Sequence, residues 1–260
     1  MIFSKPSIKA VVVLASVLFV AGGTLVYANH SWGSYHWARK SNPFTLKLGN
    51  NVSSAWYAYL SETSSDWSAS TMLDTTVVQG GTNPKNCRAT TGRVEVCSSK
   101  YGANGWLGVA QIWISGSHII KSTVKVNDSY FDTATYNTPP WRRLVMCQEV
   151  GHVFGLDHQD VNFSNPNIGT CMDYTSNPSG PPSNEHPNTH DYEQLGTIYA
   201  HLDSTTTVSQ TISSRFGNGN GADVIEWGKE IKKDSRGKTS MYVRDLGNGE
   251  KVFTFVIWAD

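Results

Sequence analysis

The sequence has little charge and no excess of either sign. Asp, Glu, Lys and Arg make up 16% of its 260 residues, with 21 basic and 21 acidic side chains. A protein that binds nucleic acid needs a surplus of lysine and arginine to meet the phosphates. The balance of charge therefore predicts no nucleic acid partner.

Long apolar runs are missing after the N-terminus. The one uncharged apolar stretch covers residues 10–27, follows Lys5 and Lys9, and ends in the small-residue pattern Val26-Tyr27-Ala28. These features are typical of a signal peptide, here cleaved after Ala28. An uncleaved membrane anchor is the alternative, because a span needs about 20 residues. Either reading places the rest of the chain outside the cytosol, and we expect a secreted protein.

The sequence also lacks the C-x-x-C spacing that is typical of cysteine zinc sites. Its four cysteines, in an exported protein, instead predict two disulfide bonds. Three pairings are open from the sequence. Cys87 and Cys97 flank a short polar stretch, which favours a bond between them and leaves Cys147 to pair with Cys171.

Residues 148–158, with the sequence Gln-Glu-Val-Gly-His-Val-Phe-Gly-Leu-Asp-His, carry the strongest chemical signal. They match the zinc-peptidase pattern H-E-x-x-H-x-x-G-x-x-H at every fixed position except the first. Gln148 and His152 are four apart, so both can face one ion from one side of a helix. Glu149 can then take a proton from a metal-bound water. Gly155 permits a left-handed turn that returns His158 as a third ligand.

A second signal, Cys171-Met172-Asp173-Tyr174, follows at a distance suited to a Met-turn. With it, residues 141–174 resemble the metzincin clan of zinc metallopeptidases, nearest to matrixins and astacins. The resemblance implies an α+β fold, a mixed twisted sheet packed on helices, with Zn²⁺ as the cofactor. It also implies that Met172 lies beneath the metal and that Tyr174 binds zinc or steadies the tetrahedral intermediate. Ordinary core packing is the alternative for both side chains.

Gln148 departs from the clan's pattern at a metal ligand. A glutamine amide is neutral and a poorer zinc donor than imidazole. Gln148 can still ligate in a weaker site, or another residue can replace it; the candidates nearest in sequence are His186, His190 and Asp160. The third alternative is a metzincin-shaped protein that binds without cutting. The presence of Glu149, which has no structural task that alanine could not perform, favours a working site.

Outside these motifs the sequence predicts a helix at residues 51–60 and strands at 75–79, 94–97, 109–115 and 122–126. The resemblance implies that one strand lines the cleft and pairs with an extended substrate. Residues 119–126 are our candidate, with a plain internal strand as the alternative. The proline-rich residues 177–187 predict a loop, after which Asn188 or Thr189 can cap a helix that runs to about Leu202.

The predicted organisation is a signal peptide (1–28), a metzincin-like catalytic domain (29–203), a linker (204–221) and a small β appendage (222–260) with a hairpin. The predicted function is a secreted zinc endopeptidase that acts on protein or peptide substrates. Glu149 is its general base, and Gln148, His152 and His158 hold the metal. The alternative is a non-catalytic secreted peptide-binding protein. Contact with a membrane is expected only if the N-terminal segment stays uncleaved, and latency of the matrixin type is not expected.

Overall fold

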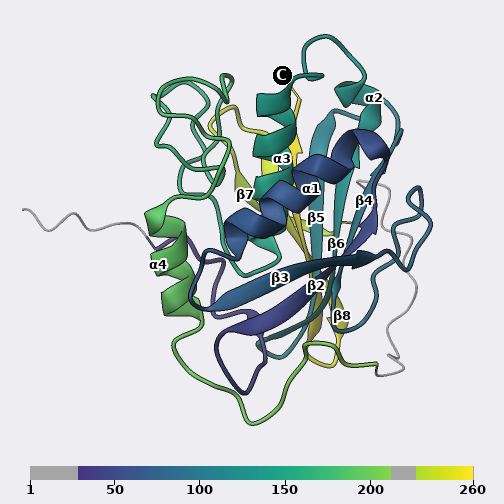
Figure 1. Ribbon diagram of the computed structural model, residues 1–260, viewed down its shortest axis with the longest axis vertical. Helices are drawn as coiled ribbons and strands as arrows, with labels where there is room; N and C mark the ends of the chain where they lie inside the picture. The colour runs from purple at the N-terminus through teal and green to yellow at the C-terminus, as the bar shows by residue number, and fades with distance from the viewer. Residues whose placement is uncertain (1–28, 212–226, 260) are drawn as a thin grey trace, which may run out of the picture.

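A computed structural model describes residues 29–211 and 227–259 (Figure 1). The predicted signal peptide and most of the predicted linker lie outside these residues. The helices are α1 (Ser54–Trp67), α2 (Asp128–Phe131), α3 (Pro139–His152) and α4 (Thr189–Ile198). The strands are β1 (His36–Trp37), β2 (Phe44–Asn51), β3 (Leu73–Gln79), β4 (Val94–Ser99), β5 (Trp106–Ser115), β6 (His118–Asn127), β7 (Lys229–Lys233), β8 (Thr239–Gly247) and β9 (Glu250–Trp258).

The strands form one twisted mixed sheet in the order β3-β2-β4-β6-β5-β9-β8-β7, and β1 pairs with β6. Strands β3, β2, β4 and β6 run parallel, whereas every pair from β5 to β7 is antiparallel. Helices α1 and α3 lie against one face of this sheet (Figure 1). The fold is therefore a mixed α/β arrangement in which α1 and α3 contact each other on one face of the sheet, α1 over β2 and β3 and α3 over β5 and β6.

Helix α3 runs from Pro139 to His152, so it starts two residues earlier than Trp141, the start that the sequence favours. Pro139 and Pro140 occupy its first turn, where backbone N–H groups have no partner within the helix, so the N–H that proline lacks is not needed. The helix gives way at Val153, and Gly155 follows with a φ of +102°. A Cβ on Gly155 would lie 2.6 Å from the carbonyl oxygen of Tyr35, so a larger residue would clash as well as strain the backbone. The predicted glycine turn after the helix is confirmed.

Other predicted elements need small changes. All four predicted strands are present, although each is longer than expected. The predicted helix at 51–60 starts at Ser54 and continues to Trp67, because β2, which the sequence analysis did not predict, occupies the chain up to Asn51. Asn188 caps α4 through a capping box with Asp191, as expected, but this helix ends at Ile198 rather than near Leu202.

Both predicted disulfides are present, Cys87–Cys97 and Cys147–Cys171. The second bond fastens α3 to the segment that carries Met172. The indole Nε1 of Trp67 donates to the carbonyl oxygen of Cys147 at 3.2 Å and so fixes α1 against α3. Among residues 29–211 and 227–259, no helix is long and apolar enough to cross a membrane.

The C-terminal strands differ from the predicted appendage. Strands β8 and β9 correspond to the expected hairpin, but β9 pairs with β5 from Trp106 to Ser115 and so continues the main sheet. Residues 252–257 of β9 are all buried, and burial of this apolar run explains why the segment joins the core instead of standing apart. The candidate cleft strand, residues 119–126, belongs to β6. This strand lies between β4 and β5, so it is the internal strand of the alternative and has no free edge for a substrate.

Candidate metal centre

The two histidines of the motif meet in the structure. His152 lies in the last turn of α3, and the chain reversal at Gly155 brings His158 back beside it. Their Nε2 atoms are 3.1 Å apart, and the ring centroids are 4.5 Å apart. His152 is fully buried and His158 is 8% exposed. The spacing G-x-x-H therefore places two imidazole nitrogens at one point, as the sequence predicted.

The hydrogen-bond partners of the two rings indicate which ring nitrogen carries the hydrogen. Nδ1 of His152 lies 2.9 Å from the carbonyl oxygen of Leu156, which can only accept, so Nδ1 carries the hydrogen. Nδ1 of His158 faces the carboxylate of Asp157 at 3.5 Å. Nε2 of His152 therefore offers a lone pair toward Nε2 of His158, and either a hydrogen of the His158 ring or a metal ion can lie between the two atoms. Burial, followed by the adjacent His158, lowers the pKa of His152 well below its usual range, which disfavours the proton.

Gln148 adds an unsatisfied amide one turn before His152 in α3. Its side chain is fully buried, and neither Oε1 nor Nε2 has a hydrogen-bond partner. A buried polar group without a partner costs about 1–3 kcal/mol. A metal ion that accepted Oε1 as a ligand would remove part of this cost. The donor set of two imidazoles and one amide oxygen is therefore compatible with zinc, although weaker than three imidazoles.

Glu149 is held in a dry position between α3 and the sheet. It is fully buried, and a Cβ on Gly108 of β5 would lie 2.7 Å from its Oε1. Burial raises the pKa of Glu149 well above its usual range, while backbone groups of Ala110 and Ile257 act in the opposite direction. Neither carboxylate oxygen makes a hydrogen bond of ordinary geometry. A carboxyl with a raised pKa and free oxygens is suited to accept and return a proton.

Met172 lies directly against α3. A Cβ on Gly151 would approach its Sδ to 2.5 Å, so the sulfur occupies the space that the helix leaves at this glycine. Tyr174 is also buried, and its ring lies 4.3 Å from the ring of His158. Its hydroxyl donates to the carbonyl oxygen of Val256 in β9 at 3.0 Å. The predicted catalytic tyrosine thus borders the histidines, with its hydroxyl engaged by the C-terminal strand.

Strand β9 supplies site contacts that the sequence analysis missed. The ring of Phe255 stacks on the ring of His152, with centroids 4.1 Å apart and an interplanar angle of 15°. On the other side, the indole Nε1 of Trp32 donates to the carbonyl oxygen of His152 at 3.2 Å. Nothing in the local pattern of residues 250–258 marks this role, because it depends on pairing with a strand more than 130 residues earlier in the chain.

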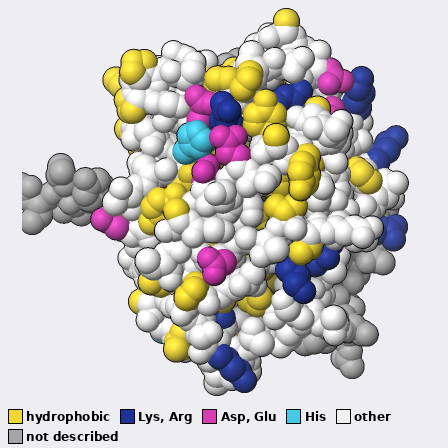
Figure 2. Space-filling model, in the orientation of Figure 1, with side chains coloured by type: hydrophobic (Ala, Val, Ile, Leu, Met, Phe, Trp, Pro, Cys, Tyr) yellow, Lys and Arg dark blue, Asp and Glu magenta, His cyan; other side chains and the backbone are white. Residues whose placement is uncertain are grey.

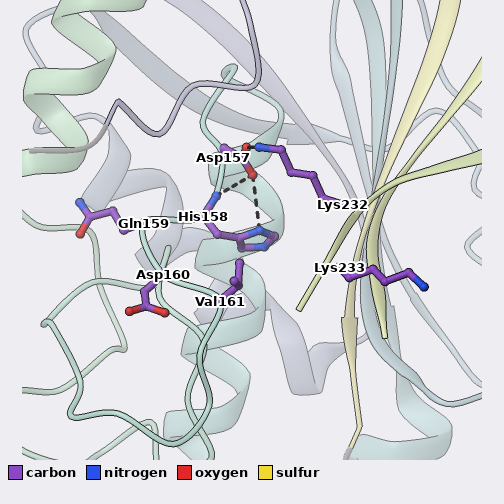
Figure 3. A pocket seen from close by; sticks show the side chains of 7 residues that line it. All are labelled: Asp157, His158, Gln159, Asp160, Val161, Lys232 and Lys233. Carbon is purple, nitrogen blue, oxygen red and sulfur yellow. Dashed lines mark hydrogen bonds and ion pairs between the residues drawn. The ribbon is translucent and has the colours of Figure 1, made fainter. Parts of the chain in front are cut away.

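An open pocket of about 420 Å³ reaches the site from the side of His158. Residues 157–161 form one wall, and Lys232 and Lys233 of β7 form the other (Figure 3). Lys232 makes an ion pair with Asp157, the residue that faces the His158 ring. Burial acts to raise the pKa of Asp157, but the contacts with His158 and Lys232 lower it overall, so this carboxylate stays ionised.

The alternative ligands have partners of their own. Nδ1 of His186 lies 2.7 Å from the carboxylate of Asp66, and His190 faces Glu193 at 3.9 Å. Asp160 lines the pocket beside His158, but its carboxylate accepts hydrogen bonds from Asn162 and Asn165.

Figure 2 shows acidic, basic and histidine side chains gathered near the top of one face. Ion pairs of Arg143 with Glu62 and Glu185, at 3.0 and 2.9 Å, join α1, α3 and the loop before α4. His186 with Asp66 links the same loop to α1. These contacts account for His186 without a metal.

No family model and no curated protein matches this sequence. Among solved structures, two of myroilysin align with TM-scores of 0.38, at 13% and 14% sequence identity. The alignments cover 66% and 65% of this chain and 98% and 87% of the other chains. A similarity of this size carries no argument about activity, so the chemistry has to be argued from the chain's own residues.

Proposed function

We propose that the protein is a secreted zinc-dependent endopeptidase with a metzincin-like active site. The observation that carries the proposal is the meeting of His152 and His158, whose Nε2 atoms lie 3.1 Å apart in a buried position. Gln148 and Glu149, from the same motif, add buried polar atoms without hydrogen-bond partners. A divalent metal ion would satisfy this set of groups, and hydrophobic packing would not.

His152, His158 and Gln148 would hold the zinc ion. When bound, zinc polarises a carbonyl group and lowers the pKa of a coordinated water toward neutrality. Glu149 would accept a proton of the attacking water on a carboxylate oxygen and return it to the leaving amine nitrogen. Its buried environment favours the protonated carboxyl that exists between these two transfers. Tyr174 is the proposed second catalytic residue, since burial raises the pKa of its hydroxyl and keeps it a hydrogen-bond donor.

Export is supported by the covalent structure. The two disulfides favour an oxidising compartment, because cytosolic thiols are kept reduced. The N-terminal pattern of Lys5, Lys9 and an apolar stretch supports a signal peptide, with cleavage after Ala28. N-terminal sequencing of the exported protein tests this part: a mature chain that starts at Asn29 supports cleavage, and a chain that starts before the apolar stretch indicates an anchor.

The metal is tested first by elemental mass spectrometry on the full chain. We expect that Gln148→Ala lowers zinc affinity by about 10–100-fold, the usual effect of weakening a metal's surroundings. Glu62→Ala is the matched control, because Glu62 is a half-buried side chain of α1 that pairs with Arg143 and contacts none of the proposed ligands. Zinc binding that is unchanged in Gln148→Ala would show that another residue completes the site.

The reaction is tested by hydrolysis of an unfolded protein substrate with the zinc-loaded chain. Glu149→Ala should reduce the rate by about 10²–10⁴-fold, the usual contribution of a general base, without loss of zinc. Hydrolysis by Glu149→Ala at the rate of an active wild-type chain would refute the assigned role. A chain that binds zinc and peptides, but cuts none even when its cleft is open, would be the non-catalytic binder instead.

A further inference from the structure

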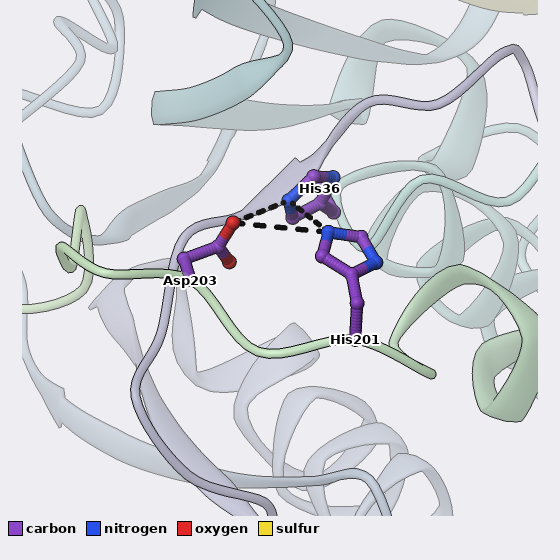
Figure 4. Close-up of side chains that lie close together, drawn as sticks. All are labelled: His36, His201 and Asp203. Carbon is purple, nitrogen blue, oxygen red and sulfur yellow. Dashed lines mark hydrogen bonds and ion pairs between the residues drawn. The ribbon is translucent and has the colours of Figure 1, made fainter.

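A second cluster of metal-ligating side chains lies away from α3. It brings together His36 of β1, His118 at the start of β6, and His201 and Asp203, which follow α4. The Nε2 atoms of His36, His118 and His201 lie 3.3, 3.2 and 3.7 Å from the same oxygen, Oδ1 of Asp203. Figure 4 shows His36, His201 and Asp203 pointing toward one another, with the two histidine Nε2 atoms 3.2 Å apart.

The surrounding hydrogen bonds fix the orientation of the cluster. Nδ1 of His36 lies 2.7 Å from the carbonyl oxygen of Ser34, so it carries the hydrogen and leaves a lone pair on Nε2. That lone pair faces a carboxylate oxygen and a second imidazole nitrogen. Arg39 donates to the other carboxylate oxygen, Oδ2 of Asp203, from Nη1 at 3.0 Å and from its backbone N–H at 3.2 Å. Arg39 therefore turns Oδ1 toward the three histidines, as outer partners of metal ligands do.

We propose that His36, His201 and Asp203 bind a zinc ion that stabilises the fold, with His118 beside the carboxylate as an outer partner. Two imidazole nitrogens and one carboxylate oxygen, all within 4.8 Å of one another, are a donor set suited to zinc. Nitrogen donors also argue against calcium and magnesium. The ion would join the segment before β2 to the segment after α4. The exposed faces of His201 and His118 give the metal a route of entry.

The test compares zinc content and melting temperature in His201→Ala, Asp203→Asn and the control His186→Ala. His186 is similarly exposed but pairs with Asp66 instead. We expect His201→Ala and Asp203→Asn each to bind one zinc per chain fewer than wild type, and added zinc to raise the melting temperature less in them than in the control.

Because the readout is a difference of one ion, it does not depend on the zinc content of the α3 site. Zinc binding equal to wild type in both variants would overturn the proposal. In that case His36 is a protonated partner of Asp203, and the cluster is an ion pair. His118→Ala tests the outer partner of Asp203: zinc affinity should fall by about 10–100-fold, whereas unchanged affinity would show that His118 does not position this carboxylate.

A different observation concerns access to the α3 site. Three successive residues of β9 cover it: Phe255 stacks on His152, the carbonyl of Val256 accepts the hydroxyl of Tyr174, and a backbone group of Ile257 lies near Glu149. As a result, no part of Glu149 or His152 is exposed.

The same strand also occupies the edge of β5. An extended peptide would bind beside α3 by pairing with this edge, but β9 is paired with it along its whole length. Lys232 of β7 adds an ion pair to Asp157 at the mouth of the pocket. In this arrangement neither water nor substrate has room at Glu149.

We infer, on the basis of the proposed function, that residues 227–259 are an internal inhibitor that keeps the enzyme latent until they leave the cleft. Strand β9 lies where an extended substrate would lie, and it presents backbone groups and an aromatic ring to the site residues. Strands β7 to β9 pair with the rest of the described sheet through β9 alone, and their release would also break the hydrogen bonds of Ser235 with Val161 and Phe163.

The test uses the full chain with a specific protease recognition sequence placed at residues 217–220, between the two described parts. Cutting there, followed by displacement of the C-terminal fragment in mild urea, should raise peptide hydrolysis at least tenfold. The same cut chain carrying Glu149→Ala is the control and should stay inactive. Full activity before cutting would overturn the inference while leaving the proposed function intact.

Hydrogen exchange of the β5 amides distinguishes the remaining outcomes. Faster exchange after cutting, with no hydrolysis by the zinc-loaded chain, would show that the strand is a removable cover over a cleft that does not catalyse, and the proposed function would fail. A fragment that cannot be displaced before the whole chain unfolds would show that β9 is a permanent part of the core. Lys232→Ala should raise the basal rate of the uncut chain, whereas Lys229→Ala, an exposed lysine of β7 outside this pocket, should not.

Discussion

The contact between Met172 and α3 can be tested by a single added methyl group. A Cβ at Gly151 would lie 2.5 Å from Sδ of Met172 and 2.8 Å from Cζ2 of Trp67, and both side chains are fully buried. Alanine in a helix interior is favoured over glycine by about 1 kcal/mol. Overpacking a close-packed core costs about 1–3 kcal/mol. Two contacts below 3.0 Å place Gly151→Ala near the upper end, so we expect a net destabilisation of about 1–2 kcal/mol.

Gly196 offers a matched control in α4. It is also helical, but a Cβ there would meet nothing within 4 Å. Gly196→Ala should therefore stabilise the protein by up to about 1 kcal/mol, the propensity gain alone. The same substitution thus has opposite signs in the two helices. The size of the difference measures how tightly Met172 and Trp67 fill the space beneath the active-site helix.

The measurement is urea unfolding of both variants and wild type, followed by tryptophan fluorescence and compared at equal zinc loading. Substitution of Met172 by Ala in the Gly151→Ala background should recover part of the loss caused by the added methyl group, which a double-mutant cycle detects as coupling. A Gly151→Ala variant that is as stable as Gly196→Ala would refute the packing of Met172 against α3, and with it the comparison to a Met-turn.

Three further changes have defined outcomes. Tyr174→Phe removes the hydrogen bond to the carbonyl of Val256 and should cost about 1 kcal/mol in urea unfolding; no change would indicate that the hydroxyl is not bound to β9. Burial acts to raise the pKa of Glu95, but hydrogen bonds from neighbouring side chains outweigh it, so the pKa is lowered in the folded protein. Ionised Glu95 therefore stabilises the folded protein above pH 4.5, and this contribution is lost as the pH falls through the lower folded-state pKa. Glu95→Gln should therefore destabilise the protein at pH 7 and converge with wild type in acid unfolding; a constant difference would contradict this. Asn188→Ala should lower the free energy of unfolding by about 1 kcal/mol, because the cap on α4 is lost. Ser53→Ala should lower it by less, because Ser53 makes no side-chain cap on α1. Equal losses in the two variants would count against the capping box.

Local chemistry explains which predictions succeeded. The Gly155 turn and the Asn188 cap depend on backbone preferences of single residues, and each lies where the sequence indicates. The short polar stretch between Cys87 and Cys97 favoured the disulfide pairing that the structure has, although the sequence left three pairings open. Strand β2 was not predicted. Its alternation of buried Phe44, Leu46 and Leu48 with exposed residues was a usable signal for a strand.

The sequence by itself determined the composition of the candidate active site. Spacing on one helix and one glycine turn suffices to bring His152 and His158 together, because these are contacts within eleven residues of chain. Only the tertiary structure decided what surrounds them. The pairing of β9 with β5, and the meeting of His36, His118, His201 and Asp203, join residues far apart in sequence. Such contacts follow from how the whole sheet assembles, and no local pattern specifies which distant strand or loop will fill a given space.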